Sequence, residues 1–187
     1  LQRHDYTVLS IYVNPTQFND ASDFANYPST VERDCELAQA CGVDAVILPT
    51  YEQLYADAFT YRVDECQTSL KLEGEKRPGH YQGVLTVVMK LLNCVKPTCL
   101  YMGEKDFQQY KLVAGMVKAF FMPTTVVLCP TVREASGLAL SSRNQRLTDL
   151  GRRKAAALFR ALSLKDCSVN EVVSSLQREG IEVEYVE

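Results

Sequence analysis

The chain runs Val8-Leu-Ser-Ile-Tyr-Val13 near its beginning and then breaks at Asn14-Pro15. A short apolar run rich in β-forming residues and closed by a proline is typical of a buried strand in a parallel sheet. Similar runs at 45–48, 99–102 and 124–128 are separated by stretches with helical patterns. Strand, helix and strand in this order favour right-handed β-α-β units, so we expect an α/β fold with an open parallel sheet.

Helices are expected where a start signal precedes an apolar face. Ser29-x-x-Glu32 forms a capping box, which predicts a helix to about residue 41. Asp106 is expected to cap a later helix, which Pro123 would stop. Further expected elements are a helix over 83–94 and an extended piece over 59–63.

The pattern changes after Pro130, and we place a domain boundary near residue 131. Thr148-Asp149 predicts a helix to about residue 162. Ser168-x-x-Glu171 is a capping box for a second helix, and residues 182–186 alternate as a strand. We therefore expect a Rossmann-like domain over residues 1–131 and a small α+β domain over residues 132–187.

Composition excludes several classes of function. The 187 residues are 47% hydrophobic and 23% charged, which is the balance of a soluble globular protein. Twenty basic against twenty-three acidic residues give a net charge of −3, whereas a nucleic-acid-binding protein has a basic excess. No apolar run approaches the ~18 residues of a membrane span. We expect no nucleic-acid partner and no membrane partner.

Seven scattered cysteines without a C-x-x-C pair suit neither a disulfide framework nor a zinc site. Two histidines far apart in the sequence argue against a zinc centre, and the sequence identifies no metal ligands. Free thiols and the lack of a signal-peptide pattern favour a reducing compartment, so we expect a cytoplasmic protein. The chain starts at Leu1 without Met and stops at Glu187 directly after a strand-like run, so we expect a piece truncated at both ends.

Three polar stretches follow expected strands, where ligands of parallel sheets bind. In the first, Asn14-Pro-Thr-Gln-Phe18, the side chain of Gln17 can hold hydroxyl and carboxylate groups of a small substrate. The alternative is a turn that only ends the strand.

The second stretch is Tyr101-Met-Gly-Glu-Lys-Asp-Phe-Gln-Gln109. Gly103 permits close backbone approach, and Lys105 adds a point charge beside free helix N–H groups. Gln109, one turn into the helix, is expected to point to the same end of the helix as Lys105. This arrangement suits a nucleotide phosphate whose charge grows in the transition state, although a surface lysine before a capped helix would look the same.

The third stretch contains Val132-Arg-Glu and, further on, Leu138-Ala-Leu-Ser-Ser-Arg-Asn144. Two hydroxyls followed by the guanidinium of Arg143 offer forked donors to a phosphate, although serine-rich loops are common. A fourth stretch, Gly74-Glu-Lys-Arg-Pro-Gly-His80, precedes the helix at 83–94. Its Arg77 and His80 face a cleft or make local hydrogen bonds.

Taken together, V-N-P-x-Q-F, E-G-x-x-R-P-G-H-x-x-G-V, G-E-K-D-F-Q-Q and L-S-S-R-N, in this order, resemble the pantothenate synthetase family. Its members are ATP-dependent pantoate–β-alanine ligases of the nucleotidyltransferase superfamily. The resemblance covers almost the whole chain. It implies a ligase with ATP, pantoate and β-alanine as substrates, assisted by Mg²⁺ and acting as a homodimer.

The resemblance also implies a role for each matched residue. Gln17 and Gln109 would hold pantoate, and Arg77 and His80 match further substrate-binding positions. Lys105 and Arg143 are the expected catalytic residues, because they stabilise phosphate charge. The implied ATP-binding residues are Gly103, Glu104, Lys105, Asp106, Val132, Leu140, Ser141, Ser142 and Arg143.

One family feature has no match in this chain. The family has a central first strand and a paired-histidine motif ahead of V-N-P-x-Q-F, so we expect an exposed strand edge and poor ligation by these residues alone. Residues 132–187 would then be part of the family's lid domain. The alternatives are another nucleotidyltransferase and a non-catalytic nucleotide-binding or dimerisation module.

Overall fold

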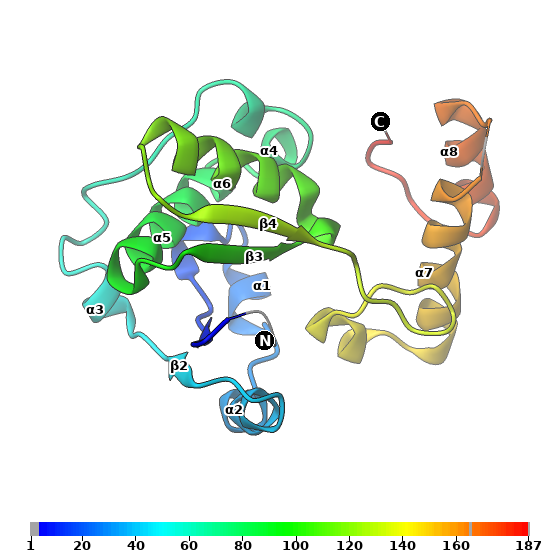
Figure 1. The fold of residues 1–187 in the computed structure, drawn as a ribbon. Coiled ribbons are helices and arrows are strands. Elements are labelled where there is room, and N and C mark those ends of the chain that lie inside the picture. Colours follow the sequence, from blue (N-terminus) through cyan, green and yellow to red (C-terminus); the bar gives the residue numbers. More distant parts are fainter. Residues whose placement is uncertain (1–3, 165, 187) are drawn as a thin grey trace. The chain divides into compact units, whose positions relative to one another are not determined.

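A computed structural model describes residues 4–164 and 166–186 of the chain (Figure 1). The chain packs as two compact units, and each is described by itself. The first unit comprises residues 1–102 and 106–128, and the second comprises residues 103–105 and 129–187. Among the described residues, no helix is both long and apolar enough to cross a membrane.

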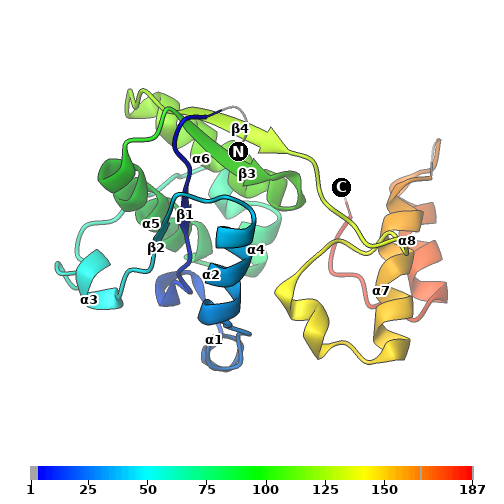
Figure 2. The same ribbon diagram turned by 60° about the horizontal axis from the view of Figure 1, so that its bottom comes forward.

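The first unit contains two pairs of strands. The parallel pair is β1 (Val8–Ser10) with β2 (Ala45–Ile47), in which Leu9 lies opposite Val46 (Figure 2). The other pair is β3 (Cys99–Gly103) with β4 (Thr125–Cys129), whose arrows point the same way in Figure 1. Helices α1 and α2 lie between β1 and β2 in the chain, and α6 lies between β3 and β4, so the prediction of an α/β fold with parallel strands is confirmed. In the described residues, however, the strands form two separate sheets rather than the single sheet that we predicted.

The longest helix of this unit is α5 (His80–Val95), which packs against α6 (Phe107–Ala119). Their apolar faces form the main core, which includes Leu85 and Val113, both almost fully buried. The shorter elements are α1 (Ala21–Ala25), α2 (Val31–Ala40), α3 (Tyr51–Leu54), α4 (Glu73–Lys76) and the 3-10 turns η1 (Pro15–Gln17), η2 (Thr68–Leu70) and η3 (Glu104–Asp106).

The second unit is held together by two helices, α7 (Asp149–Leu162) and α8 (Val169–Arg178). Both begin as predicted, because Thr148 caps α7 and Ser168 forms a reciprocal capping box with Glu171. The turn η4 (Ser142–Arg146) precedes them.

Two predicted strands are wrong. Residues 59–63 form no strand, because Ala58 and Phe59 turn the chain with positive φ angles of 50° and 59°. Residues 182–186 also form none, although the alternation has a physical basis. The apolar residues of this segment, Val183 and Val186, pack against the core between α7 and α8.

Three predicted helix starts need correction. The proposed Ser29–Glu32 capping box does not form, because α2 begins at Val31 and Thr30 takes the cap position. Asp106 does stand at the cap position of α6, but its side chain makes no capping hydrogen bond. The helix α5 begins three residues earlier than predicted, at His80, and its N-cap residue Gly79 has a left-handed φ of 81°, which favours glycine.

Gly83 lets α5 approach η1 closely. A Cβ atom at this position would lie 2.4 Å from the carbonyl oxygen of Thr16. Gly115 occupies the interior of α6, and its missing Cβ would meet nothing within 4 Å. Both positions are helical, so the two glycines differ in the space around them.

We predict opposite effects of alanine at these two glycines. Gly83→Ala should lower the free energy of unfolding by roughly 1–3 kcal/mol, since overpacking forces backbone shifts. Gly115→Ala should raise it by about 0.5–1 kcal/mol, since alanine favours the helix. Urea unfolding of both variants measures these changes, and equal stabilisation by the two substitutions would contradict the close approach.

Candidate functional site

The Asn14 side chain organises the loop after β1. Only 2% of Asn14 is exposed. Its Oδ1 atom accepts from the hydroxyls of Tyr55 (2.9 Å) and Thr16 (3.0 Å). Its Nδ2 atom donates to the Gly83 carbonyl (3.3 Å) and to Gln17 Oε1 (3.2 Å). Every face of this buried amide is therefore satisfied, as burial of a polar group requires.

Gln17 is the last residue of η1 and is half-buried. Since its Oε1 atom accepts from Asn14, its Nε2 atom points the other way, with two N–H donors. Asn19 adds a second tie from this loop, donating its side-chain amide to the Pro78 carbonyl.

His80 fixes the same loop from the start of α5. The residue is 7% exposed, and its Nδ1 atom lies 2.8 Å from the carbonyl oxygen of Gln17. Because a carbonyl only accepts, Nδ1 carries the proton of the neutral ring. Burial lowers the pKa of His80, which outweighs the raising effect of the hydrogen bond to Gln17. The charges of Arg77, Glu73 and Asp106 also act on its pKa, with Arg77 lowering it and both acids raising it.

Arg77 directly follows α4 and is half-buried. Its guanidinium lies 3.4 Å from the Glu73 carboxylate, one helical turn away. This ion pair with Glu73 is local, and the predicted contact of Arg77 with substrate stays a prediction.

The stretch after β3 is exposed at its tip. Gly103 ends the strand, and Lys105 lies in η3 with its side chain exposed. Gln109 lies half-buried in the first turns of α6. Its neighbour Gln108, which sequence reasoning missed, donates to the carbonyls of Thr68 (2.9 Å) and Lys71 (2.8 Å). Adjacent glutamines carry no signal that separates an anchor from a ligand-binding residue.

The second unit holds the remaining predicted ATP-binding residues in one loop. The backbone N–H of Leu140 donates to the Val132 carbonyl at 3.0 Å, and both side chains are exposed. Ser141 caps η4 by accepting from the N–H of Arg143. Asn144, the last residue of L-S-S-R-N, ties the loop by donating to the Ala139 carbonyl at 2.9 Å.

Arg152 supports this loop, which sequence reasoning missed. Its guanidinium lies 2.6 Å from the Glu134 carboxylate and donates to the Asn144 carbonyl at 3.3 Å. Arg152 lies eighteen residues after Glu134 and eight residues after Asn144, with a loop between them. These separations follow neither the helical nor the strand period, so the sequence pattern could not predict the contacts. Arg152 thus links the two halves of the predicted phosphate-binding loop.

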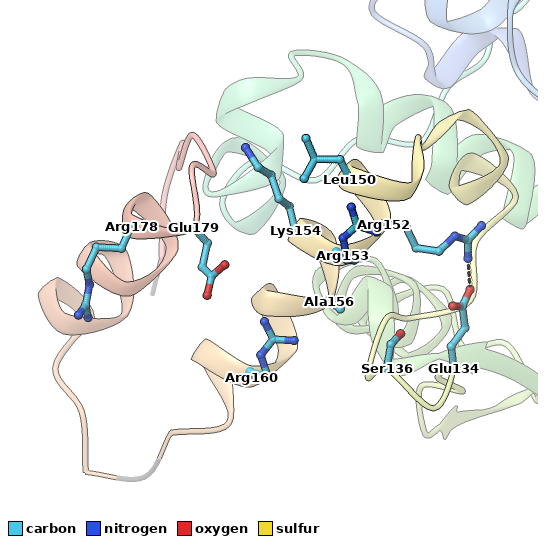
Figure 3. A pocket seen from close by; sticks show the side chains of 10 residues that line it. All are labelled: Glu134, Ser136, Leu150, Arg152, Arg153, Lys154, Ala156, Arg160, Arg178 and Glu179. Carbon is cyan, nitrogen blue, oxygen red and sulfur yellow. Dashed lines mark hydrogen bonds and ion pairs between the residues drawn. The ribbon is translucent and has the colours of Figure 1, made fainter.

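The unit also has a basic cleft of about 630 Å³ beside α7 (Figure 3). The residues that line it are Glu134, Ser136, Leu150, Arg152, Arg153, Lys154, Ala156, Arg160, Arg178 and Glu179. None of the predicted site residues lines this cleft.

The predicted site residues therefore divide between the units. The first unit brings His80 against Gln17, with Arg77 and Asp106 close enough to affect the pKa of His80. The second unit holds Gly103–Lys105 together with Val132 and 140–143. The assignments to ATP and pantoate stay predictions. Among the described residues, no group of three or more His, Cys, Asp or Glu side chains could hold a metal ion.

Parallel β-α-β units with polar loops after their strands define an α/β protein of the class that binds ligands beyond the carboxyl ends of its strands. The family model described as "Pantoate-beta-alanine ligase" matches residues 1–187. The chain belongs to this family. The predicted resemblance, and with it the assignment to the ligases, is confirmed.

Individual relatives agree with this assignment. The pantothenate synthetase of Bdellovibrio bacteriovorus is 50% identical over 185 residues, which are 99% of this chain and 73% of the relative. The pantothenate synthetase of Legionella pneumophila is 50% identical over 186 residues, with 100% and 73% covered. The crystal structure of the Francisella tularensis pantoate-beta-alanine ligase complexed with "Beta-gamma ATP and Beta-alanine" matches with a TM-score of 0.92 at 38% identity. The match covers 100% of this chain and 72% of that one.

We predict that His80 makes stability depend on pH. Its pKa is lower in the folded protein than in the unfolded chain, where it is about 6.5. The unfolded state therefore takes up a proton first as the pH falls, so the free energy of unfolding should decrease below about pH 6.5. Urea unfolding between pH 7 and about 5.5 should give a smaller decrease for His80→Gln than for the wild type. Identical pH dependence of the two proteins would contradict the role of His80.

Proposed function

We propose that this protein joins pantoate and β-alanine to form pantothenate, using ATP and passing through a pantoyl-adenylate intermediate. A carboxylate oxygen of pantoate attacks the α-phosphorus of ATP, the bond to the β-phosphate breaks, and pyrophosphate leaves. The amine of β-alanine then attacks the acyl carbon, the bond to AMP breaks, and the amine loses a proton. The observation that carries the proposal is the match of the whole chain to a ligase complexed with an ATP compound and β-alanine.

The reaction needs no protein nucleophile. Both attacking atoms belong to substrates, so the protein contributes by positioning them and by stabilising phosphate charge. Gln17 is suited to the first task, since its fixed amide presents N–H donors to a carboxylate or hydroxyl oxygen. Gln109 is proposed as its partner in holding pantoate, with His80 and Arg77 beside the Gln17 loop.

The residues proposed to contact ATP are Gly103, Glu104, Lys105, Asp106, Val132, Leu140, Ser141, Ser142 and Arg143. Lys105 and Arg143 would offset the charge that develops on the phosphates, the ammonium as a point charge and the guanidinium as a fork. Mg²⁺ is proposed to arrive with ATP, bound by its phosphate oxygens as is usual for this ion.

Two further properties are proposed. All seven cysteines are free, which suits a reducing compartment, so we place the protein in the cytoplasm. We also propose a homodimer on the basis of the family resemblance. Sedimentation of the purified protein at twice the chain mass would support the dimer, and sedimentation at 21.0 kDa would contradict it.

The function is tested by product formation with the intact parent protein, since poor ligation is expected of residues 1–187 alone. Pyrophosphate release should require both ATP and pantoate, and addition of β-alanine should yield pantothenate and AMP in equal amounts. Pyrophosphate release without pantoate would favour another nucleotidyltransferase. Calorimetric binding of ATP and pantoate without AMP formation would favour a binding module.

We predict that Lys105→Ala, made in the intact parent protein, slows adenylate formation by at least ~10²-fold, which is the scale of losing one preorganised donor. Lys118→Ala is the matched control, because Lys118 is an exposed lysine in the last turn of α6. Single-turnover measurement of pyrophosphate release compares the two variants with the wild type. Near-normal release by Lys105→Ala would show that Lys105 is only a surface residue.

A further inference from the structure

Tyr55 is a buried residue that the sequence analysis did not single out. It follows α3, only 2% of it is exposed, and its hydroxyl donates to Asn14 Oδ1 at 2.9 Å. This hydroxyl also lies 3.2 Å from the hydroxyl of Thr16. The hydroxyl of Tyr55 therefore contacts the η1 loop.

The ring of Tyr55 is held from several sides. Tyr51 and Phe59 lie with their ring centroids 4.9 Å and 5.3 Å away, and the ammonium of Lys90 lies 4.9 Å from the ring centroid. Lys90 is itself fixed, since it donates to the Leu54 carbonyl at 2.7 Å and pairs with Asp57 at 2.6 Å. The packing of these residues around the ring thus fixes the Tyr55 hydroxyl against Asn14.

The hydrogen bonds fix which atoms donate and which accept along the series Tyr55, Asn14 and Gln17. The Gly83 carbonyl only accepts, so the edge of the Asn14 amide that faces it must be Nδ2. The opposite edge, Oδ1, then requires donors, which Tyr55 and Thr16 supply. Because Nδ2 also faces Gln17, the Gln17 amide must turn Oε1 inward and Nε2 outward.

We propose that Tyr55 is a positioning residue for Gln17, acting through Asn14. Its hydroxyl holds the acceptor edge of Asn14, and Asn14 in turn holds the acceptor edge of Gln17. Gln17 then presents only N–H groups to the ligand, so it takes an acceptor such as a carboxylate oxygen. The proposal rests on the proposed function, in which Gln17 binds pantoate.

Tyr55→Phe tests the proposal, since it removes the hydroxyl and keeps the packed ring. We expect the KM for pantoate to rise about 3- to 10-fold, the scale of one net hydrogen bond, with the KM for ATP and the kcat unchanged. Tyr51→Phe is the matched control, because Tyr51 lies one turn before Tyr55 and no hydrogen bond of its hydroxyl is found among the described residues. It should leave every constant unchanged. A purely structural role for Tyr55 would instead lower the melting temperature and the kcat while both KM values stay the same, which would overturn the proposal.

Thr16→Val is a second test, which still applies if the Tyr55→Phe protein does not fold. It removes the second donor to Asn14 Oδ1 with little change of shape, so the same selective rise in the KM for pantoate is expected. No change in that KM for either folded variant would overturn the proposal.

A readout independent of activity separates the proposal from the function. In protein labelled with ¹⁵N-glutamine, the side-chain amide signals of Gln17, assigned with Gln17→Glu, should shift or broaden in Tyr55→Phe and not in Tyr51→Phe. If the protein releases no pyrophosphate with pantoate, the proposed function fails, and these signals still decide the positioning role. Signals that are the same in Tyr55→Phe and the wild type would overturn it.

Discussion

The buried amide of Asn14 is the constraint on which the first unit's candidate site depends. It makes four hydrogen bonds to residues that lie up to 69 positions apart in the chain. Since an unsatisfied buried amide costs as much as a lost hydrogen bond or more, η1, α5 and the end of α3 can pack only in the arrangement that pairs it. The backbone carbonyl at position 83 accepts from Asn14, and glycine is required there because a Cβ would meet the Thr16 carbonyl oxygen at 2.4 Å.

The predicted phosphate-binding loop of the second unit is stabilised differently. Among the described residues of this loop (132–146), no side-chain amide is fully buried. Arg152 pairs with Glu134 of this loop, and both side chains are only partly buried. Partly exposed pairs of this kind contribute little to stability by themselves. The loop therefore depends on its backbone hydrogen bonds, such as that between Leu140 and Val132, and it can present exposed side chains to a ligand.

Sequence patterns predicted most of the elements, and the errors have physical causes. Ser168 and Glu171 formed the expected capping box, whereas Ser29 and Glu32 did not, because the helix began one residue later and put Glu32 out of register. The alternation of apolar and polar residues at 182–186 reflects packing of one side of this segment on α7 and α8. A strand and an irregular segment that pack on one side have the same alternation. A local pattern cannot distinguish them without knowing what lies opposite.

The site was predictable in part. The motifs brought out Gln17, Lys105 and Arg143 by their chemistry and by the family resemblance. Tyr55, Arg152 and Gln108 could not be found in this way, because they act through contacts with residues distant in the sequence. Asn14 was visible only as a residue that ends a strand, although its burial and partners make it the centre of the loop.

Neutron diffraction from deuterium-exchanged crystals tests the central claim most directly, since it distinguishes nitrogen with its deuterons from oxygen in each amide. The account predicts deuterons on the edge of Asn14 that faces Gly83 and on the outward edge of Gln17. Deuterons on the edge of Asn14 that faces Tyr55, or on the inward edge of Gln17, would contradict it.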